Sequence, residues 1–210
     1  SPDGELLLTN WNGVLTLRDG DTGARKFDVD PKITGGRAIM PAWSPDGTRV
    51  AFVQVPPEGK LGSDFPVPNA PKGGDWVAAN TGNLAVMRFE NGAFQPARVV
   101  LPSEKGVEYH YQPSWSPDSS FLIFVTATAP GFAPAAWKVI YGVDNPVLPP
   151  EYRDYVMTYD QRETRLRLLQ INGQGEPVGL AAELDAATRR PSQSISWPRF
   201  APFQQGQLAF

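Results

Sequence analysis

A short motif, Trp-Ser-Pro-Asp-Gly, recurs together with the apolar run behind it and constrains the fold of this chain more than any other feature. One copy occupies residues 43–53, and a second occupies residues 115–125, where Ser119 replaces the glycine. The chain opens inside a further copy at residues 1–8 and closes in a degraded one at residues 197–210. Self-similarity of this kind predicts one supersecondary unit that is repeated along the chain.

Each copy predicts a hairpin. Serine, proline, aspartate and glycine suit the four successive positions of a type I turn, and the aspartate then caps backbone amides. The run behind each turn is apolar or alternating, as in a buried strand, and such a hairpin cannot bury its apolar face alone. We therefore expect structural turn roles, not catalytic carboxylates, in this set: Ser44, Pro45, Asp46, Gly47, Ser116, Pro117 and Asp118.

Hairpins that are repeated at long intervals along a chain can bury their apolar faces against one another when four-stranded blades stack around a common axis. This predicts an all-β fold, a β-propeller or a segment of one, built of four-stranded antiparallel blades. The turns start at Ser1, Ser44, Ser116 and Ala201, and the first spacing of 43 residues is an ordinary blade length. We predict one domain with blade repeats at residues 1–43, 44–115 and 116–200, and the start of a further repeat at residues 201–210. Either further blades lie outside these residues, or the chain holds weaker repeats.

The expected strands follow the apolar runs between turn signals. They cover residues 5–10, 13–18, 24–29, 38–44, 49–55, 83–89, 94–101, 121–128, 165–171, 177–180, 194–200 and 207–210. Residues 181–188 are either a short helix or loop. Two insertions, residues 56–82 and 129–164, show little apolar periodicity and are expected to be surface loops.

The motif at residues 43–53 closely resembles the TolB-like β-propeller repeat, which is also found in the propellers of prolyl-oligopeptidase-type peptidases. Residues 115–125 match it apart from Ser119, and residues 197–210 match loosely, with Arg199-Phe200-Ala201-Pro202 where the family has Ser-Pro-Asp-Gly. The resemblance covers nearly the whole chain outside the insertions. The resemblance is specific evidence for the fold but weak evidence for the function, because proteins with a propeller fold have many unrelated functions.

The resemblance implies a non-catalytic binding or scaffold protein of the bacterial envelope or exterior, with a periplasmic, outer-envelope or extracellular location. Its partner would be another protein or an envelope polymer. Two alternatives stay open: the propeller domain of a larger prolyl-oligopeptidase-like hydrolase, or a structural subunit of a surface assembly that contacts its neighbours.

Blade geometry selects one face as the expected binding face. Both insertions join the second strand of a blade to the third, so they share a face with the connections at residues 31–39, 102–110 and 186–193. Large loops on one face of a rigid scaffold are typical of binding sites, although they can also only stabilise the neighbouring blades. Aromatic side chains concentrate there and can anchor a partner or pack the loops onto the blades. The candidate binding residues are Trp76, Tyr109, His110, Tyr111, Trp137 and Tyr152, from a group that includes Phe65, Phe132, Tyr141 and Tyr155.

The amino-acid composition argues against several other classes of partner and site. The net charge of −3 with no basic block disfavours nucleic acid and anionic membranes as partners. The chain has no cysteine and one histidine, His110, so we expect no metal site, no thiolate chemistry and no cofactor. The Asp19-Gly20-Asp21-Thr22-Gly23 run is similar to the start of a calcium loop but lacks the later acidic ligands, and a hairpin turn explains it.

Catalytic and targeting motifs are also missing from the sequence. We find no nucleophile elbow, no phosphate loop and no dinucleotide-binding glycine pattern. No apolar run reaches the length of a transmembrane helix, and no signal peptide is recognisable. Because residue 1 falls inside a repeat, we expect the chain to be a mature or truncated piece of a longer one.

Overall fold

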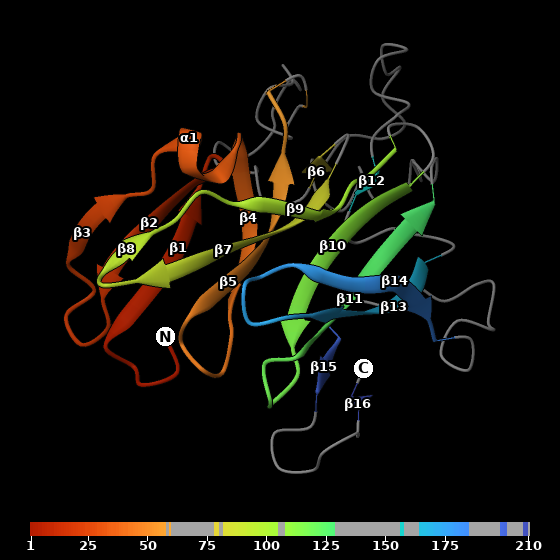
Figure 1. The fold of residues 1–210 in the computed structure, drawn as a ribbon. Coiled ribbons are helices and arrows are strands. Elements are labelled where there is room, and N and C mark those ends of the chain that lie inside the picture. Colours follow the sequence, from red (N-terminus) through yellow and green to blue (C-terminus); the bar gives the residue numbers. More distant parts are fainter. Residues whose placement is uncertain are drawn as a thin grey trace.

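The computed structural model describes residues 1–57, 59, 78–79, 82–104, 108–128, 156–157, 164–184, 198–200 and 208–209. These residues form a series of antiparallel sheets that follow one another along the chain (Figure 1). Within these ranges no helix is long and apolar enough to cross a membrane.

Three larger sheets carry most of the fold, and in each the strands lie side by side in chain order. The first contains β1 (Leu6–Trp11), β2 (Val14–Asp19) and β3 (Arg25–Asp28). The second contains β4 (Arg37–Trp43), β5 (Arg49–Val55) and β7 (Asn83–Glu90), with β8 (Ala93–Phe94) and β9 (Arg98–Leu101) both paired to β7. The third contains β10 (Glu108–Trp115), β11 (Phe121–Thr128), β13 (Thr164–Ile171) and β14 (Pro177–Glu183).

Smaller elements complete the described part of the chain. A short helix, α1 (Pro31–Thr34), connects the first sheet to the second and is capped by the Asp30 side chain. Two-residue strands form the pairs β6 (Ala78–Ala79) with β12 (Val156–Met157) and β15 (Arg199–Phe200) with β16 (Leu208–Ala209).

The sheets stack as consecutive blades of a β-propeller segment. Strand β4 packs against β1 and β2 of the first blade, and β10 packs against β4, β5 and β7 of the second. Strand β15 in turn contacts β10, so the hairpin β15–β16 continues the series after the third blade. The strands that precede the turns, β4, β10 and β15, therefore lie next to one another on the inner side.

Strand β5 shows why residues 50–53 form a continuous apolar run. Val50 and Phe52 belong to the core shared with the first blade, whereas Ala51 belongs to the core shared with the third. All seven residues of β5 are buried, because a blade covers each of its faces. A strand that is buried on both sides reads as apolar throughout, not as alternating.

The Ser-Pro-Asp-Gly stretches form the expected turns. The backbone N–H of Gly47 donates to the carbonyl of Ser44 at 2.9 Å, and the Ser44 hydroxyl accepts from the N–H of Arg49 at 3.0 Å. The Asp46 carboxylate accepts from the N–H and the hydroxyl of Thr48 at 2.9 and 2.7 Å. The bonds donated by the backbone recur in the copies that start at Ser1 and Ser116, and in the second of these the Ser120 hydroxyl takes the place of the Thr48 hydroxyl.

Ser119, which replaces the motif glycine, links two blades. It adopts the left-handed conformation of the glycine it replaces, with φ of 59° against 72° for Gly47. Its hydroxyl accepts a hydrogen bond at 3.0 Å from the backbone N–H of Asp46 in the neighbouring turn. Ser119 is 3% exposed, so this bond is shielded from water. The departure from the motif therefore fastens the second blade to the third.

Substitutions at Ser119 should separate backbone strain from the inter-blade bond. We expect Ser119→Ala to lower the free energy of unfolding by about 1–2 kcal/mol, because it loses the bond and keeps the unfavourable backbone. Ser119→Gly loses the same bond but relieves the backbone, so it should be less destabilising by about 1 kcal/mol. Urea unfolding of the three proteins measures this order. Equal stability of the alanine and glycine variants would contradict the account.

Several predicted elements need correction. The connection at residues 31–39 contains α1, because Asp30 and Pro31 form a helix start that we had not predicted. The strand expected at residues 94–101 is divided into β8 and β9, with Pro96 between them. Strand β10 already begins at Glu108, within the connection expected at residues 102–110. The helix considered for residues 181–188 is wrong at its start, where β14 extends to Glu183.

The two insertions leave the blades at the same end. Arg37 at the start of β4 lies opposite Val55 at the end of β5, which places α1 beside the beginning of the first insertion. The described parts of the two insertions, β6 and β12, pair with each other (Figure 1). The Ser-Pro-Asp-Gly turns lie at the opposite end of the strands.

Candidate functional site

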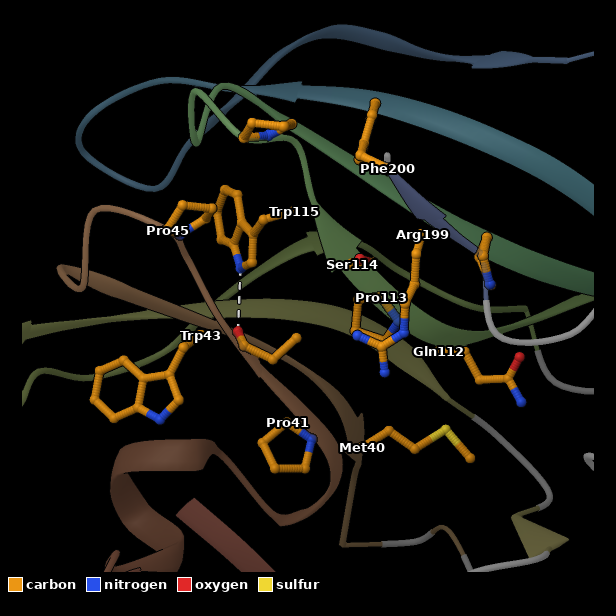
Figure 2. A pocket seen from close by; sticks show the side chains of 13 residues that line it. Met40, Pro41, Trp43, Pro45, Gln112, Pro113, Ser114, Trp115, Arg199 and Phe200 are labelled. Atoms are coloured by element: carbon orange, nitrogen blue, oxygen red, sulfur yellow. Dashed lines mark hydrogen bonds between the residues drawn. The ribbon is translucent and has the colours of Figure 1, made fainter. Parts of the chain in front are cut away.

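A cavity of about 640 Å³ lies between the inner strands of successive blades (Figure 2). Strands β4, β10 and β15 form its walls, and Pro45 and Pro117 of the turns extend it to the turn end of the blades. Its lining residues are Met40, Pro41, Ala42, Trp43, Pro45, Gln112, Pro113, Ser114, Trp115, Pro117, Pro198, Arg199 and Phe200. The cavity thus reaches the end opposite the insertions.

The repeat itself builds this cavity. The stretch from Met40 to Trp43 and the stretch from Gln112 to Trp115 occupy the same place before their turns and both line the cavity. In the degraded copy, Pro198 and Phe200 take the places of the proline and the tryptophan. Because equivalent positions of successive blades face one axis, the walls repeat the same proline and aromatic chemistry.

Both complete walls contain a strained bulge. Met40 and Gln112 each have a φ of 53°, in the left-handed region that non-glycine residues rarely adopt. The pairing register shifts between Ile39 and Ala42 in β4 and at the equivalent place in β10. A proline follows each residue and further disfavours helical backbone there. Bulges re-aim side chains next to binding sites, and local strain of this kind concentrates at functional positions.

Trp115 holds one wall in place. Its indole N–H donates to the carbonyl of Ala42 in the second blade at 3.1 Å, as the dashed line in Figure 2 shows. The guanidinium of Arg49 lies 4.9 Å from its ring centroid, within range of a cation–π interaction. The aromatic wall is therefore fixed before any ligand arrives.

The lining is apolar except for a few polar groups. Arg199 is the one charged residue among the described residues of the lining, and it is exposed. Figure 2 shows its side chain extending from β15 towards Pro113 and into the space between β4 and β10. No acid–base pair lines this cavity, and the described residues contain no group of three metal-ligating side chains. The geometry suits binding of an apolar segment that carries a negative charge.

The structure places three predicted binding residues inside a strand. Tyr109, His110 and Tyr111 lie in β10 and are each 0% exposed. The connection expected at residues 102–110, which contains Tyr109 and His110, is therefore wrong from Glu108 onwards, because β10 begins earlier than the motif suggested. Tyr109 and Tyr111 pack with Met40 in a small core.

His110 is held by two hydrogen bonds. Its Nε2 lies 3.1 Å from the Pro102 carbonyl, which can only accept, so Nε2 carries the proton. Its Nδ1 lies 3.1 Å from the Thr126 hydroxyl and accepts from it. Burial lowers the pKa of His110 to about 4, although the bond to Pro102 opposes the shift. His110 is therefore neutral near pH 7 and has a structural role.

The remaining candidate residues that the sequence singled out are not among the described residues that line the cavity. The binding candidates Trp76, Trp137 and Tyr152 lie outside the described residues, as do Phe65, Phe132, Tyr141 and Tyr155. The run from Asp19 to Gly23 forms the turn between β2 and β3, where the Asp19 carboxylate accepts from the N–H and hydroxyl of Thr22 at 3.0 and 2.8 Å. These bonds lower the pKa of Asp19 to about 2.

Sequence reasoning missed the cavity. The turn is the most recognisable part of the motif, but the residues just before the turn line the cavity. The signal was present, because a proline stands two residues before the tryptophan in both complete copies. A proline on an inner strand interrupts pairing at that edge and marks a bulge.

Known proteins that are similar to this chain are found among solved structures. No protein-family model and no curated protein matches the sequence. Among solved structures, the chain is similar to a protein of Agrobacterium tumefaciens assigned as TolB, with 15% identity and a TM-score of 0.45 over 88% of this chain and 46% of that one. It is also similar to Kuenenia stuttgartiensis hydrazine synthase, with 14% identity and a TM-score of 0.46 over 88% and 40% of the two chains.

A Pyrococcus horikoshii acylaminoacyl peptidase is a further similar structure, with 19% identity and a TM-score of 0.38 over 85% of this chain and 22% of that one. The chain thus spans less than half the length of each of these proteins. The sheet order of the chain itself is that of a β-propeller segment.

Proposed function

We propose that this chain is a non-catalytic binding propeller whose inner cavity holds an extended segment of a protein partner. The observation that carries the proposal is the repeated wall, in which a strained bulge, a proline and a tryptophan recur in two neighbouring blades and face one cavity. Strain that recurs at the same position of each wall is better explained by a shared task than by local accident.

The chemistry of the lining favours a peptide as ligand. Tryptophan and proline faces provide rigid apolar surfaces against which prolyl and aliphatic side chains pack well. Trp43 and Trp115 supply such surfaces on adjacent walls. The Ser114 hydroxyl and the Arg199 guanidinium add polar contacts that would orient the segment. Arg199 favours a segment that carries an Asp or Glu side chain.

The location and a second contact face belong to the same proposal. The resemblance to the TolB-like repeat supports an envelope or extracellular setting with a protein partner, or an envelope polymer, as ligand. The pairing of β6 with β12 brings the two insertions together at one end and supports a second contact face there. Trp76, Trp137 and Tyr152 remain candidates for that face.

If the chain were the propeller domain of a hydrolase, the catalytic residues would have to lie outside the cavity described above. The single histidine of the chain is 0% exposed and bonded on both ring nitrogens, so it is not available as a general base. A catalytic triad would have to come from another domain. The binding role needs only the residues that line the cavity.

A substitution that fills the cavity should test the proposal. Peptides are first selected on the wild-type chain from a random dodecapeptide phage library. We expect Ser114→Trp to weaken binding of the selected peptides at least about tenfold, because an indole there occupies the space between the walls. Leu180→Trp adds the same group at a position on β14 that is 96% exposed and should bind as wild type does.

The outcomes distinguish the cavity from other surfaces. Circular dichroism first establishes that both variants keep the β-sheet spectrum of the wild type. Peptides that bind Ser114→Trp and wild type equally would show that the cavity is not the site. A selection that yields no binding peptide would contradict the proposed function as a whole.

A further inference from the structure

Met40 carries the one sulfur atom among the described residues that line the cavity. The chain has no cysteine, so a mild peroxide meets sulfur only in the methionines. Met40 is partly exposed, and Figure 2 shows its side chain extending from β4 with the sulfur in yellow. Met87, by contrast, is 1% exposed within the core of the first and second blades. Of these two thioethers, Met40 is therefore the one that a small oxidant reaches through the cavity.

Met40 also joins the two complete walls of the cavity. It packs against a small core of the second blade that contains Ile39 and Val53. On its other side it packs against Tyr109 and Tyr111 of β10 in the third blade. A thioether suits this position because it is apolar and flexible and makes favourable contacts with aromatic rings. The same side chain therefore lines the cavity and holds β4 against β10.

The equivalent residue of the third blade is polar. Gln112 has the same φ of 53° as Met40 and also lines the cavity. It is 5% exposed, so this bulge accepts a polar side chain even where little of it meets water. The two walls thus differ in polarity at the bulge, with a thioether on β4 and an amide on β10. Oxygen added to the sulfur of Met40 would remove this difference.

We propose that Met40 is a redox-sensitive residue, whose oxidation by a peroxide lowers the affinity of the cavity for its peptide. This inference rests on the proposed function, because it concerns regulation of the same site. A lone pair of the sulfur attacks one oxygen of hydrogen peroxide, an S–O bond forms and the O–O bond breaks. The sulfur loses two electrons. The transferred oxygen gives its proton to the departing hydroxide, which leaves as water.

The sulfoxide weakens the site in two ways. Its oxygen is a hydrogen-bond acceptor on a side chain that packs against apolar and aromatic residues, and a polar group without a partner is costly to bury. The oxidised side chain should therefore withdraw from Tyr109 and Tyr111 and loosen the contact between β4 and β10. An apolar segment in the cavity also loses an apolar contact with the wall.

The rate of oxidation at each sulfur tests the first step. The wild-type chain is treated with hydrogen peroxide, and the sulfoxide at each methionine is followed by mass spectrometry of its proteolytic peptides. We expect Met40 to be oxidised at least about tenfold faster than Met87, because burial shields the second sulfur. Equal rates at the two sulfurs would overturn the inference, whether or not the cavity binds a peptide.

Peptide binding after oxidation tests the second step. Peroxide treatment of the wild-type chain should weaken binding of the phage-selected dodecapeptides at least about fivefold. Met40→Leu removes the sulfur at nearly constant volume, so peroxide should leave its affinity unchanged, whatever the starting value. Met87→Leu keeps Met40 and should lose affinity on treatment as the wild type does. Met40→Gln places the polar group of the other wall on β4 and should weaken binding without any oxidant.

Each contrary result has a separate meaning. A chain that is oxidised at Met40 and binds the peptides as before would keep the cavity as a peptide site but overturn its redox control. Loss of affinity in peroxide-treated Met40→Leu would assign the effect to another residue and overturn the role of Met40. A chain that binds no selected peptide would contradict the proposed function, and the inference would fail with it.

Discussion

Replacement of Arg49 by alanine is expected to lower the free energy of unfolding by about 3–5 kcal/mol, because two backbone carbonyls lose a charged donor and each acceptor left unpaired costs about 1–3 kcal/mol. The guanidinium donates to the Asp46 carboxylate at 2.7 Å, to the Ser119 carbonyl at 2.9 Å and to the Asn172 carbonyl at 2.7 Å. Its side chain is 6% exposed and lies over the ring of Trp115. Removal of this one side chain therefore leaves acceptors in two blades without their donor.

The measurement is urea unfolding followed by tryptophan fluorescence, with a matched arginine as control. Arg88 lies directly opposite Arg49 on β7, but its side chain is 43% exposed and forms only a surface pair with Glu90. Arg88→Ala should cost less than about 1 kcal/mol. We expect Arg49→Ala to lower the melting temperature by roughly 10 °C. A similar small loss in both variants would show that the second and third blades are not joined through Arg49.

Acidification should destabilise the folded chain in two separate pH ranges. Protonation of His110 is responsible for the loss of stability in the first, less acidic range. Burial lowers the pKa of His110 to about 4, below the usual 6.5. Below pH 6.5 the imidazole of His110 is protonated in the unfolded chain but stays neutral in the folded chain. The free energy of unfolding therefore falls as the pH is lowered, until the pKa of the folded state is reached. The expected loss between pH 7 and pH 4.5 is roughly 3 kcal/mol.

The carboxylates act at lower pH. Hydrogen bonds from Ser44, Thr48 and Arg49 outweigh the opposing effect of burial and lower the pKa of Asp46, so its contribution is present above about pH 4 and is lost below it. His110 is the single histidine, so its imidazole signals in a ¹H–¹³C spectrum report its pKa directly. The variant His110→Gln should show a flat stability between pH 6.5 and 4.5. An imidazole that titrates near pH 6.5 in the folded chain would contradict the account.

The repeat made the blades predictable from sequence. Ser44 to Gly47 and the apolar run behind them have one local solution, a tight turn between strands, and the structure has that turn in three copies. The apolar run at residues 50–53 likewise indicated a buried strand, and in the structure blades cover both of its faces. Local chemistry decides these features, so the sequence is sufficient to predict them.

The cavity and the blade contacts were not predictable in the same way. The partners of Arg49 lie up to 123 residues away along the chain, and no local pattern identifies them. Tyr109 and His110 look like loop aromatics because their neighbours include charged and glycine residues, yet tertiary pairing with β11 draws them into a strand. The cavity arises from residues that each have an ordinary role within their own hairpin and acquire a common face only when blades stack.

The most direct measurement of the central claim is a crystal structure of the chain in complex with a peptide selected from the phage library. The account predicts an extended peptide between the walls that carry Trp43 and Trp115, with an acidic side chain next to Arg199. A peptide bound on the insertion end, with the space between these two walls unchanged, would contradict it.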